Sequence, residues 1–132
     1  MKGFNSNIEK DTLDNNNFRK VLYTGKKSQL VLMNLKPGEE IGMEVHNDID
    51  QFFRFEEGEG KVIIDNNEYE VSDGSAVIVP CGANHNVINT SKDKDLKLYT
   101  IYSPPEHQDK VVMKTKAEAE ALHEEFDGKT TE

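Results

Sequence analysis

Short apolar runs, each closed off by turn-forming residues, are the feature that most limits what this chain can fold into. They recur from Arg19 to Tyr102 and are rich in valine, leucine and isoleucine. None of them has the 3.6-residue period of an amphipathic helix. Eight or nine short strands at near-regular spacing predict an all-β sandwich or barrel. The runs are RKVLYT, SQLVLMNL, GMEVH, QFFRFEE, KVIID, EYEV, SAVIVP, HNVINT and LKLYTIY.

The two ends of the chain depart from this pattern. Residues 1–17 are polar and rich in asparagine, which predicts a flexible, loosely held segment. The sequence KTKAEAEALHEEF predicts a short C-terminal α-helix over residues 115–127, because Thr115 and Glu118 have the spacing of a capping box. We therefore expect a β-domain over residues 18–114, with the C-terminal helix packed outside it.

Composition narrows the compartment and the partners. The chain has 132 residues, enough for one domain, and a net charge of -9. Such an acidic surface repels phosphate groups, so we expect neither a nucleic acid nor an anionic membrane as partner. The single cysteine, Cys81, excludes an intramolecular disulfide and is expected to be an inert loop residue. No N-terminal apolar run resembles a signal peptide, which favours a cytoplasmic location and a small-molecule or protein partner.

Four polar side chains are candidates for a metal site. Glu44 and His46 are two residues apart, so on a strand they point to the same side. Gln51 shares a strand face with two phenylalanines, and His85 shares one with a valine and an asparagine. If these faces point inward, two imidazole nitrogens and two oxygens converge, a donor set suited to a divalent first-row metal. The mouth of a barrel is also a common place for a binding pocket.

Two motifs carry a resemblance to a known family. The stretch GSAVIVPCGANHNVIN resembles the second motif of the cupins, in which glycine, proline, glycine, histidine and asparagine recur at fixed spacing. In this sequence those residues are Gly74, Pro80, Gly82, His85 and Asn89.

The first cupin motif is present as a variant. Its spacing fits Gly38, Glu44, His46, Gln51 and Gly58. Glu44 stands where the family has a histidine, and Gln51 stands where the family has its glutamate. One imidazole is thus replaced by a neutral amide oxygen, while the charge of the set stays the same.

The resemblance covers about residues 21–102 and implies a small single-domain, RmlC-like cupin. It implies a double-stranded β-helix, or jelly-roll barrel, that is commonly a homodimer and holds a metal. Small cupins of this kind are often described as mannose-6-phosphate isomerase-like, and the zinc site of the larger phosphomannose isomerases uses the same four side-chain types. The amide oxygen favours harder ions such as manganese or iron, with zinc and nickel still open.

Several functions remain open at this stage. The first is a metal-dependent enzyme of oxygenase or isomerase type acting on a small organic molecule, with Glu44 or His107 as base. His107 lies on a proline-flanked loop that could cover the barrel mouth, or it is a solvent-exposed histidine. The second is a non-catalytic cupin that binds a sugar or another metabolite, and the third is a structural role. In a metal-free cupin, His46 and His85 would be neutral and hydrogen-bonded to Glu44 and Gln51.

Overall fold

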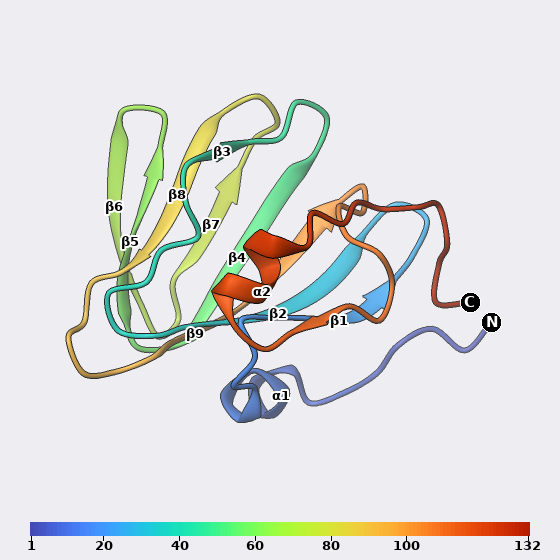
Figure 1. Ribbon diagram of the computed structural model, residues 1–132, viewed down its shortest axis with the longest axis horizontal. Helices are drawn as coiled ribbons and strands as arrows, with labels where there is room; N and C mark the ends of the chain where they lie inside the picture. The colour runs from blue at the N-terminus through green and yellow to red at the C-terminus, as the bar shows by residue number, and fades with distance from the viewer.

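The predicted strands pair into two antiparallel sheets packed face to face (Figure 1). The computed structural model describes residues 1–132. One sheet has six strands in the order β10-β1-β2-β9-β4-β7, and the other has four in the order β3-β8-β5-β6. The strands are β1 (Arg19–Thr24), β2 (Gln29–Leu35), β3 (Glu44–Val45), β4 (Asp50–Glu57), β5 (Glu59–Ile64), β6 (Asn67–Ser72), β7 (Ala76–Val79), β8 (Asn84–Asn89), β9 (Leu96–Ser103) and β10 (Val112–Met113).

Alternation along the strands builds the core between the sheets. Phe53 and Phe55 on β4 are fully buried and stack on each other with ring centroids 6.4 Å apart. Val62 on β5 and Val87 on β8 are fully buried and are paired neighbours in the opposite sheet. Burying such apolar surface is the main stabilising contribution to a fold of this size. The face of β4 that carries Phe53 and Phe55 points into the core, as its sequence predicts.

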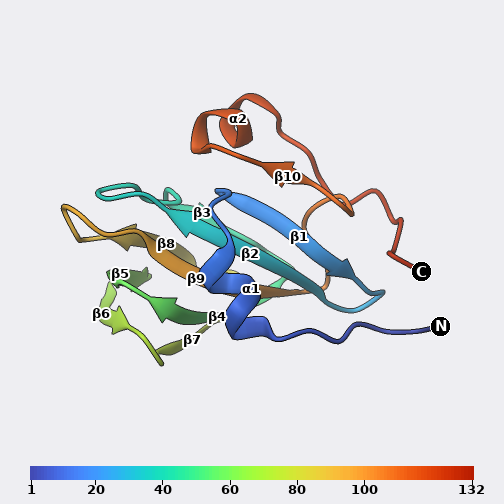
Figure 2. The ribbon, with the colours of Figure 1, turned by 90° about the horizontal axis from the view of Figure 1, so that it is seen from below.

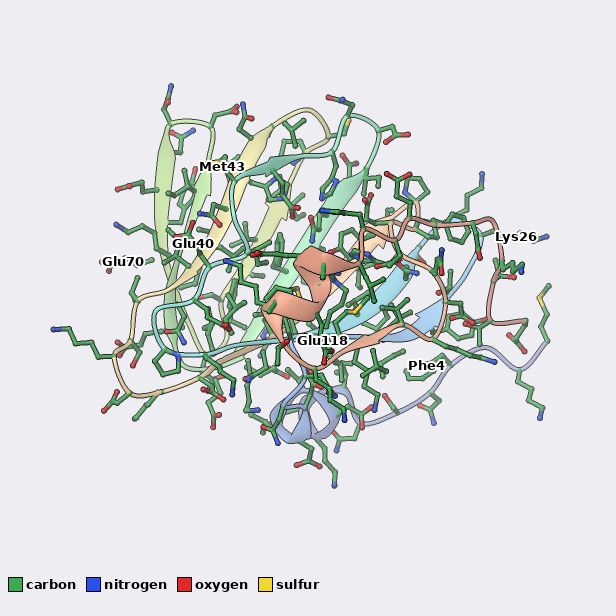
Figure 3. The ribbon with its side chains drawn as sticks, viewed as in Figure 1. Phe4, Lys26, Glu40, Met43, Glu70 and Glu118 are labelled. Atoms are coloured by element: carbon green, nitrogen blue, oxygen red, sulfur yellow. The ribbon has the colours of Figure 1, made fainter.

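The sheets form a jelly roll, but no ladder of hydrogen bonds joins them into a closed barrel. The predictions of an all-β fold and of a jelly roll are confirmed. The two sheets enclose the core as a barrel would, but their edges are not joined. Six connections carry the chain between the sheets, and the first of them runs from β2 to β3 (Figure 1). On the first of these, Glu40 accepts a hydrogen bond from Asn86 of β8 at 3.2 Å (Figure 3).

The N-terminal segment contains a helix that the sequence did not predict. Helix α1 (Ile8–Asp14) begins at Asn7, whose side chain accepts a hydrogen bond from the backbone N–H of Lys10. Thr12 is fully buried, and the ammonium group of Lys97 on β9 donates to the carbonyl oxygen of Asn15. Residues 8–17 are therefore not loosely held, because this segment packs against the six-stranded sheet.

The C-terminal helix is shorter than predicted. Helix α2 (Lys116–Ala121) has the expected cap, in which Thr115 accepts a hydrogen bond from the backbone N–H of Glu118 (Figure 3). It ends at Ala121 because the following residues are held by the loop after β9. Glu124 accepts a hydrogen bond from the His107 ring, and the Phe126 N–H donates to the carbonyl of Glu106.

The two termini lie side by side in both ribbon views (Figures 1 and 2). The carboxylate of Glu132 accepts hydrogen bonds from the backbone N–H groups of Lys2 and Gly3 and from the hydroxyl of Tyr23. The Thr131 N–H donates to the Thr24 carbonyl at 2.9 Å. These contacts fix the path of the C-terminal segment after α2. Neither helix has the length and hydropathy that a membrane-spanning segment requires.

A pair of glycine substitutions tests the close approach of the chain next to β5. Gly58 and Gly74 both have positive φ, +98° and +91°, which disfavours any other residue. An added Cβ at Gly58 would collide with the carbonyl of Asp95, whereas at Gly74 it would meet nothing within 4 Å. We expect Gly74→Ala to lower the free energy of unfolding by about 1–2 kcal/mol. Gly58→Ala should lower it by about 1–3 kcal/mol more, as measured by urea unfolding. Equal losses would contradict the close approach.

Candidate metal centre and adjoining cavity

Strand pairing brings together the polar side chains that the sequence singled out. Glu44 on β3 lies directly opposite His85 on β8 in the four-stranded sheet. His46 follows two residues after Glu44 and points to the same side. Gln51 on β4 comes from the six-stranded sheet and is buried beside the phenylalanine face of that strand. The four-stranded sheet therefore brings Glu44 and His85 together, while Gln51 is a buried polar side chain of the other sheet.

Glu44, His46 and His85 form a compact triad. Their donor atoms all lie within 4.8 Å of one another. The Oε1 atom of Glu44 is 3.5 Å from Nε2 of His46 and 3.5 Å from Nε2 of His85. Two donors that are each about 2.1 Å from a common ion, separated by the tetrahedral angle, would lie about 3.4 Å apart. The triad therefore fits the size of a divalent transition metal.

Unpartnered polar atoms point to the same conclusion. Nε2 of His46, Nε2 of His85 and Oε1 of Gln51 are all buried and have no hydrogen-bond partner. Buried polar atoms nearly always have a hydrogen-bond partner, so two such imidazole nitrogens at 3.5 Å from one carboxylate are unusual. The 3.5 Å contacts of both imidazoles with Glu44 also fit the metal-free alternative, whereas no hydrogen bond joins either imidazole to Gln51. Glu44, His46 and His85 thus fit a metal ion, and Gln51 Oε1 is a further candidate donor.

Hydrogen bonds on the far side hold these donors in orientation. Nδ1 of His85 lies 3.2 Å from the carbonyl of Ala83, which can only accept, so Nδ1 donates this hydrogen bond and Nε2 is the nitrogen that faces Glu44. Nδ1 of His46 lies 3.5 Å from the carboxylate of Glu106. The amide nitrogen of Gln51 donates to Thr100 at 3.0 Å, which turns its oxygen the other way. Outer partners of this kind are typical of metal-binding histidines.

The charges within the triad are strongly coupled. Burial alone would raise the pKa of Glu44, but the neighbouring imidazoles His46 and His85 outweigh it and lower the pKa to about 2. The Glu44 carboxylate in turn raises the pKa of His46 above its ordinary value. Protons at His46 therefore compete with a metal ion, and metal affinity should fall as the pH decreases through that pKa.

His107, the other predicted catalytic residue, is buried and not solvent-exposed. Its Nδ1 is 2.6 Å from the carboxylate of Glu124, and its Nε2 is 3.3 Å from the hydroxyl of Tyr102. Burial lowers the pKa of His107, so its neutral form is favoured. Both ring nitrogens are engaged, so contact with a substrate would require one of these hydrogen bonds to break. The ring of Tyr102 lies edge-on to His46, with centroids 6.0 Å apart.

A cavity of about 260 Å³ adjoins the triad. Glu44, with a side chain 37% exposed, is the triad member that lines it. Its lining residues come from helix α2 and the residues after it, from the start of β1, from the β2–β3 connection and from the loop after β9. The charged and titratable residues of the wall are Arg19, Glu44, Glu106, His107, Lys116, Glu120, His123, Glu124 and Glu125.

The sequence did not indicate the residues that surround the triad. Arg19 lies at the start of β1, Glu106 on the loop after β9 and Glu124 beyond α2. Their proximity to the triad depends on contacts between distant parts of the chain, which residue spacing does not encode. The only local signal was that Glu106 directly precedes His107 on the loop already considered as a cover for the site.

The contact between His46 and Glu106 yields a testable consequence. Glu106→Gln removes the charge that orients Nδ1 of His46 but leaves all four proposed donors in place. We expect metal affinity to fall by about 10- to 100-fold, as found for outer partners of metal-binding histidines. Competition with a chromophoric chelator would measure this. Glu125→Gln, an exposed carboxylate on the same cavity wall, is the matched control. Identical affinities in both variants would exclude Glu106 from this role.

Comparisons with known proteins agree with this fold. Residues 31–102 match the model of the family described as "Cupin domain". The chain is similar to the uncharacterized protein YrkC of Bacillus subtilis, with 46% identity over 93% of this chain and 69% of the relative. It is also similar to the uncharacterized protein L612 of Acanthamoeba polyphaga mimivirus, with 41% identity over 76% of this chain and 65% of the relative. Each relative is thus longer than the region shared with this chain.

A solved structure gives the same answer at the level of the whole chain. The crystal structure of BH2720 from Bacillus halodurans superposes with a TM-score of 0.89 and is 43% identical. The superposition covers 92% of this chain and 96% of the solved chain. With the matching motifs, the jelly roll and this family match, the chain belongs to the cupin family.

Proposed function

We propose that this cupin is a metal-dependent enzyme that acts on a small organic molecule, with Glu44, His46, Gln51 and His85 as the metal donors. The observation that carries the proposal is the triad itself, in which two buried imidazole nitrogens without a hydrogen-bond partner lie 3.5 Å from the Glu44 carboxylate. An apolar interior would not enclose such atoms without a compensating partner. A divalent cation bound by the triad would satisfy both imidazole nitrogens, and Gln51 Oε1 is proposed as its fourth donor.

The donor set limits the ion and its chemistry. Two imidazoles, one carboxylate and one amide oxygen suit manganese, iron, zinc or nickel. A bound metal of this kind would supply a Lewis acid, or with iron or manganese a redox centre, for isomerase-type or oxygenase-type chemistry. Four protein donors leave coordination positions for a substrate in a five- or six-coordinate site. The adjoining cavity reaches Glu44, so a substrate there would lie beside the proposed centre.

The residues around the cavity include a group that would exchange protons with a substrate. Burial raises the pKa of Glu106, and the nearby Glu44 raises it further, whereas His46 lowers it. A carboxyl group with a raised pKa in a cavity is suited to exchange protons with a substrate. The expected role of His107 changes from a direct base to a residue that orients Tyr102, since both of its ring nitrogens are occupied. A homodimeric state remains a prediction from the family resemblance.

The first experiment is metal analysis of untagged protein purified without chelator. We expect close to one equivalent of a transition metal in the unmodified protein and a near-complete loss in His46→Ala. His123→Ala is the matched control, because His123 is an exposed histidine of the same cavity wall that is not one of the proposed donors. A full metal content in His46→Ala would contradict the proposed donors.

A second readout separates an enzyme from a closed structural site. Cobalt(II) replaces these metals and has a visible spectrum that depends on its ligands. If coordination positions are open, addition of azide should change the spectrum. A cobalt spectrum that does not respond to azide would contradict the enzymatic proposal. No metal uptake from any divalent ion would instead favour the cupin that binds a metabolite without turning it over.

A further inference from the structure

One cation on the cavity wall has few partners. Arg19, the first residue of β1, has a side chain that is only 14% exposed. Its guanidinium lies 5.6 Å above the ring of Phe18, and its closest carboxylate oxygen, on Glu124, is 3.7 Å away. Its buried Nε atom has no hydrogen-bond partner. A guanidinium offers five N–H donors, so a buried arginine with one long ion pair is poorly satisfied.

The carboxylates on the inner wall are, by contrast, already paired. Glu124 accepts hydrogen bonds from the His107 ring at 2.6 Å and from the backbone N–H of Gln108 at 2.7 Å. Glu106 lies 3.5 Å from a ring nitrogen of His46, and Glu44 belongs to the triad. The group with unmet bonding capacity next to the cavity is therefore positively charged.

We propose that the cavity takes a small organic acid, whose carboxylate binds Arg19 while its other end lies beside Glu44. The second half of this statement rests on the proposed metal centre. The planar fork of a guanidinium matches the two oxygens of a carboxylate, which adds geometry to the charge attraction. Phe18 holds the plane of the guanidinium in place for such a contact.

The cavity favours a carboxylate over a phosphate. A volume of about 260 Å³ accommodates a molecule of a few carbon atoms. The second cation of the wall, Lys116, is 3.6 Å from the exposed carboxylate of Glu120, its i,i+4 partner on α2. A doubly charged phosphate would face Glu44, Glu106 and Glu124 with only Arg19 to balance it. One negative charge on a planar group is the better match.

Calorimetric titration of the metal-loaded full chain tests this inference. The probes are acetate, lactate, malonate and succinate, with inorganic phosphate as a competing chemistry and acetamide and succinamide as uncharged analogues. We expect at least one carboxylate to bind saturably, and neither amide to bind. Arg19→Gln should weaken that carboxylate by about 10- to 100-fold, the loss expected for hydrogen bonds to a charged group. Arg19→Lys, which keeps the charge without the fork, should give an intermediate affinity.

The other arginine of the chain provides the matched control. Arg54 lies on β4 and is paired with Glu56 at 3.1 Å, away from the cavity wall, so Arg54→Gln should leave the affinity unchanged. Circular dichroism establishes that each variant is folded, and Arg19→Lys carries the test if Arg19→Gln is not. Binding of phosphate alone, binding of no carboxylate, or equal affinity in a folded Arg19 variant would overturn the inference.

The same titration keeps this inference separate from the metal centre. Carboxylate binding that depends on Arg19 in a protein that takes up no metal would support the arginine site and contradict the metal proposal. A stoichiometric metal in a protein that binds none of the carboxylates would do the reverse.

Discussion

The central constraint in this structure is the burial of polar atoms that have no hydrogen-bond partner. Nε2 of His46, Nε2 of His85 and Oε1 of Gln51 are buried at the edge of the core and satisfy no hydrogen bond. Each unmet polar group costs about 1–3 kcal/mol when buried. The pairing of β3 with β8 keeps Glu44 opposite His85. The folded chain therefore retains this unfavourable free energy. A cation shared by these donors would offset it, and the fold then becomes a scaffold for the centre.

The surroundings of the triad are organised for orientation and for access. Ala83, Glu106 and Thr100 each hold one donor side chain from behind. The C-terminal segment forms the outer wall of the cavity, and its path is fixed where Glu132 holds the N-terminal residues and Tyr23. Glu124 from this segment holds His107, which contacts Tyr102. The segment that covers the cavity is thus bonded to the same loop that supplies Glu106.

The sequence predicts the scaffold well because strand alternation is local. The period of two placed Gln51 with Phe53 and Phe55 on the inward face of β4, and all three are buried. The same rule placed Glu44 and His46 on one side, and the motif spacing placed His85 on the strand that pairs with them. Those inferences needed only neighbouring residues and the geometry of an extended chain.

Other features required contacts between distant residues, which a single sequence does not reveal. The helix predicted to reach residue 127 stops at Ala121, because Glu124 and Phe126 are bonded to the loop after β9. Helix α1 was not predicted because its sequence is polar. It is held by a long-range contact, in which the Lys97 ammonium donates a hydrogen bond to the Asn15 carbonyl. The environment of His107 and the position of Arg19 beside the cavity follow from the same long-range packing.

The most direct test of the account is X-ray absorption spectroscopy of the metal-loaded protein at the metal edge. The four proposed donors predict scattering from two imidazole ligands, with all remaining nearest neighbours being oxygen. A spectrum without imidazole scattering, or one with a sulfur neighbour from Cys81, would contradict the assignment of His46, His85, Glu44 and Gln51 as the metal donors.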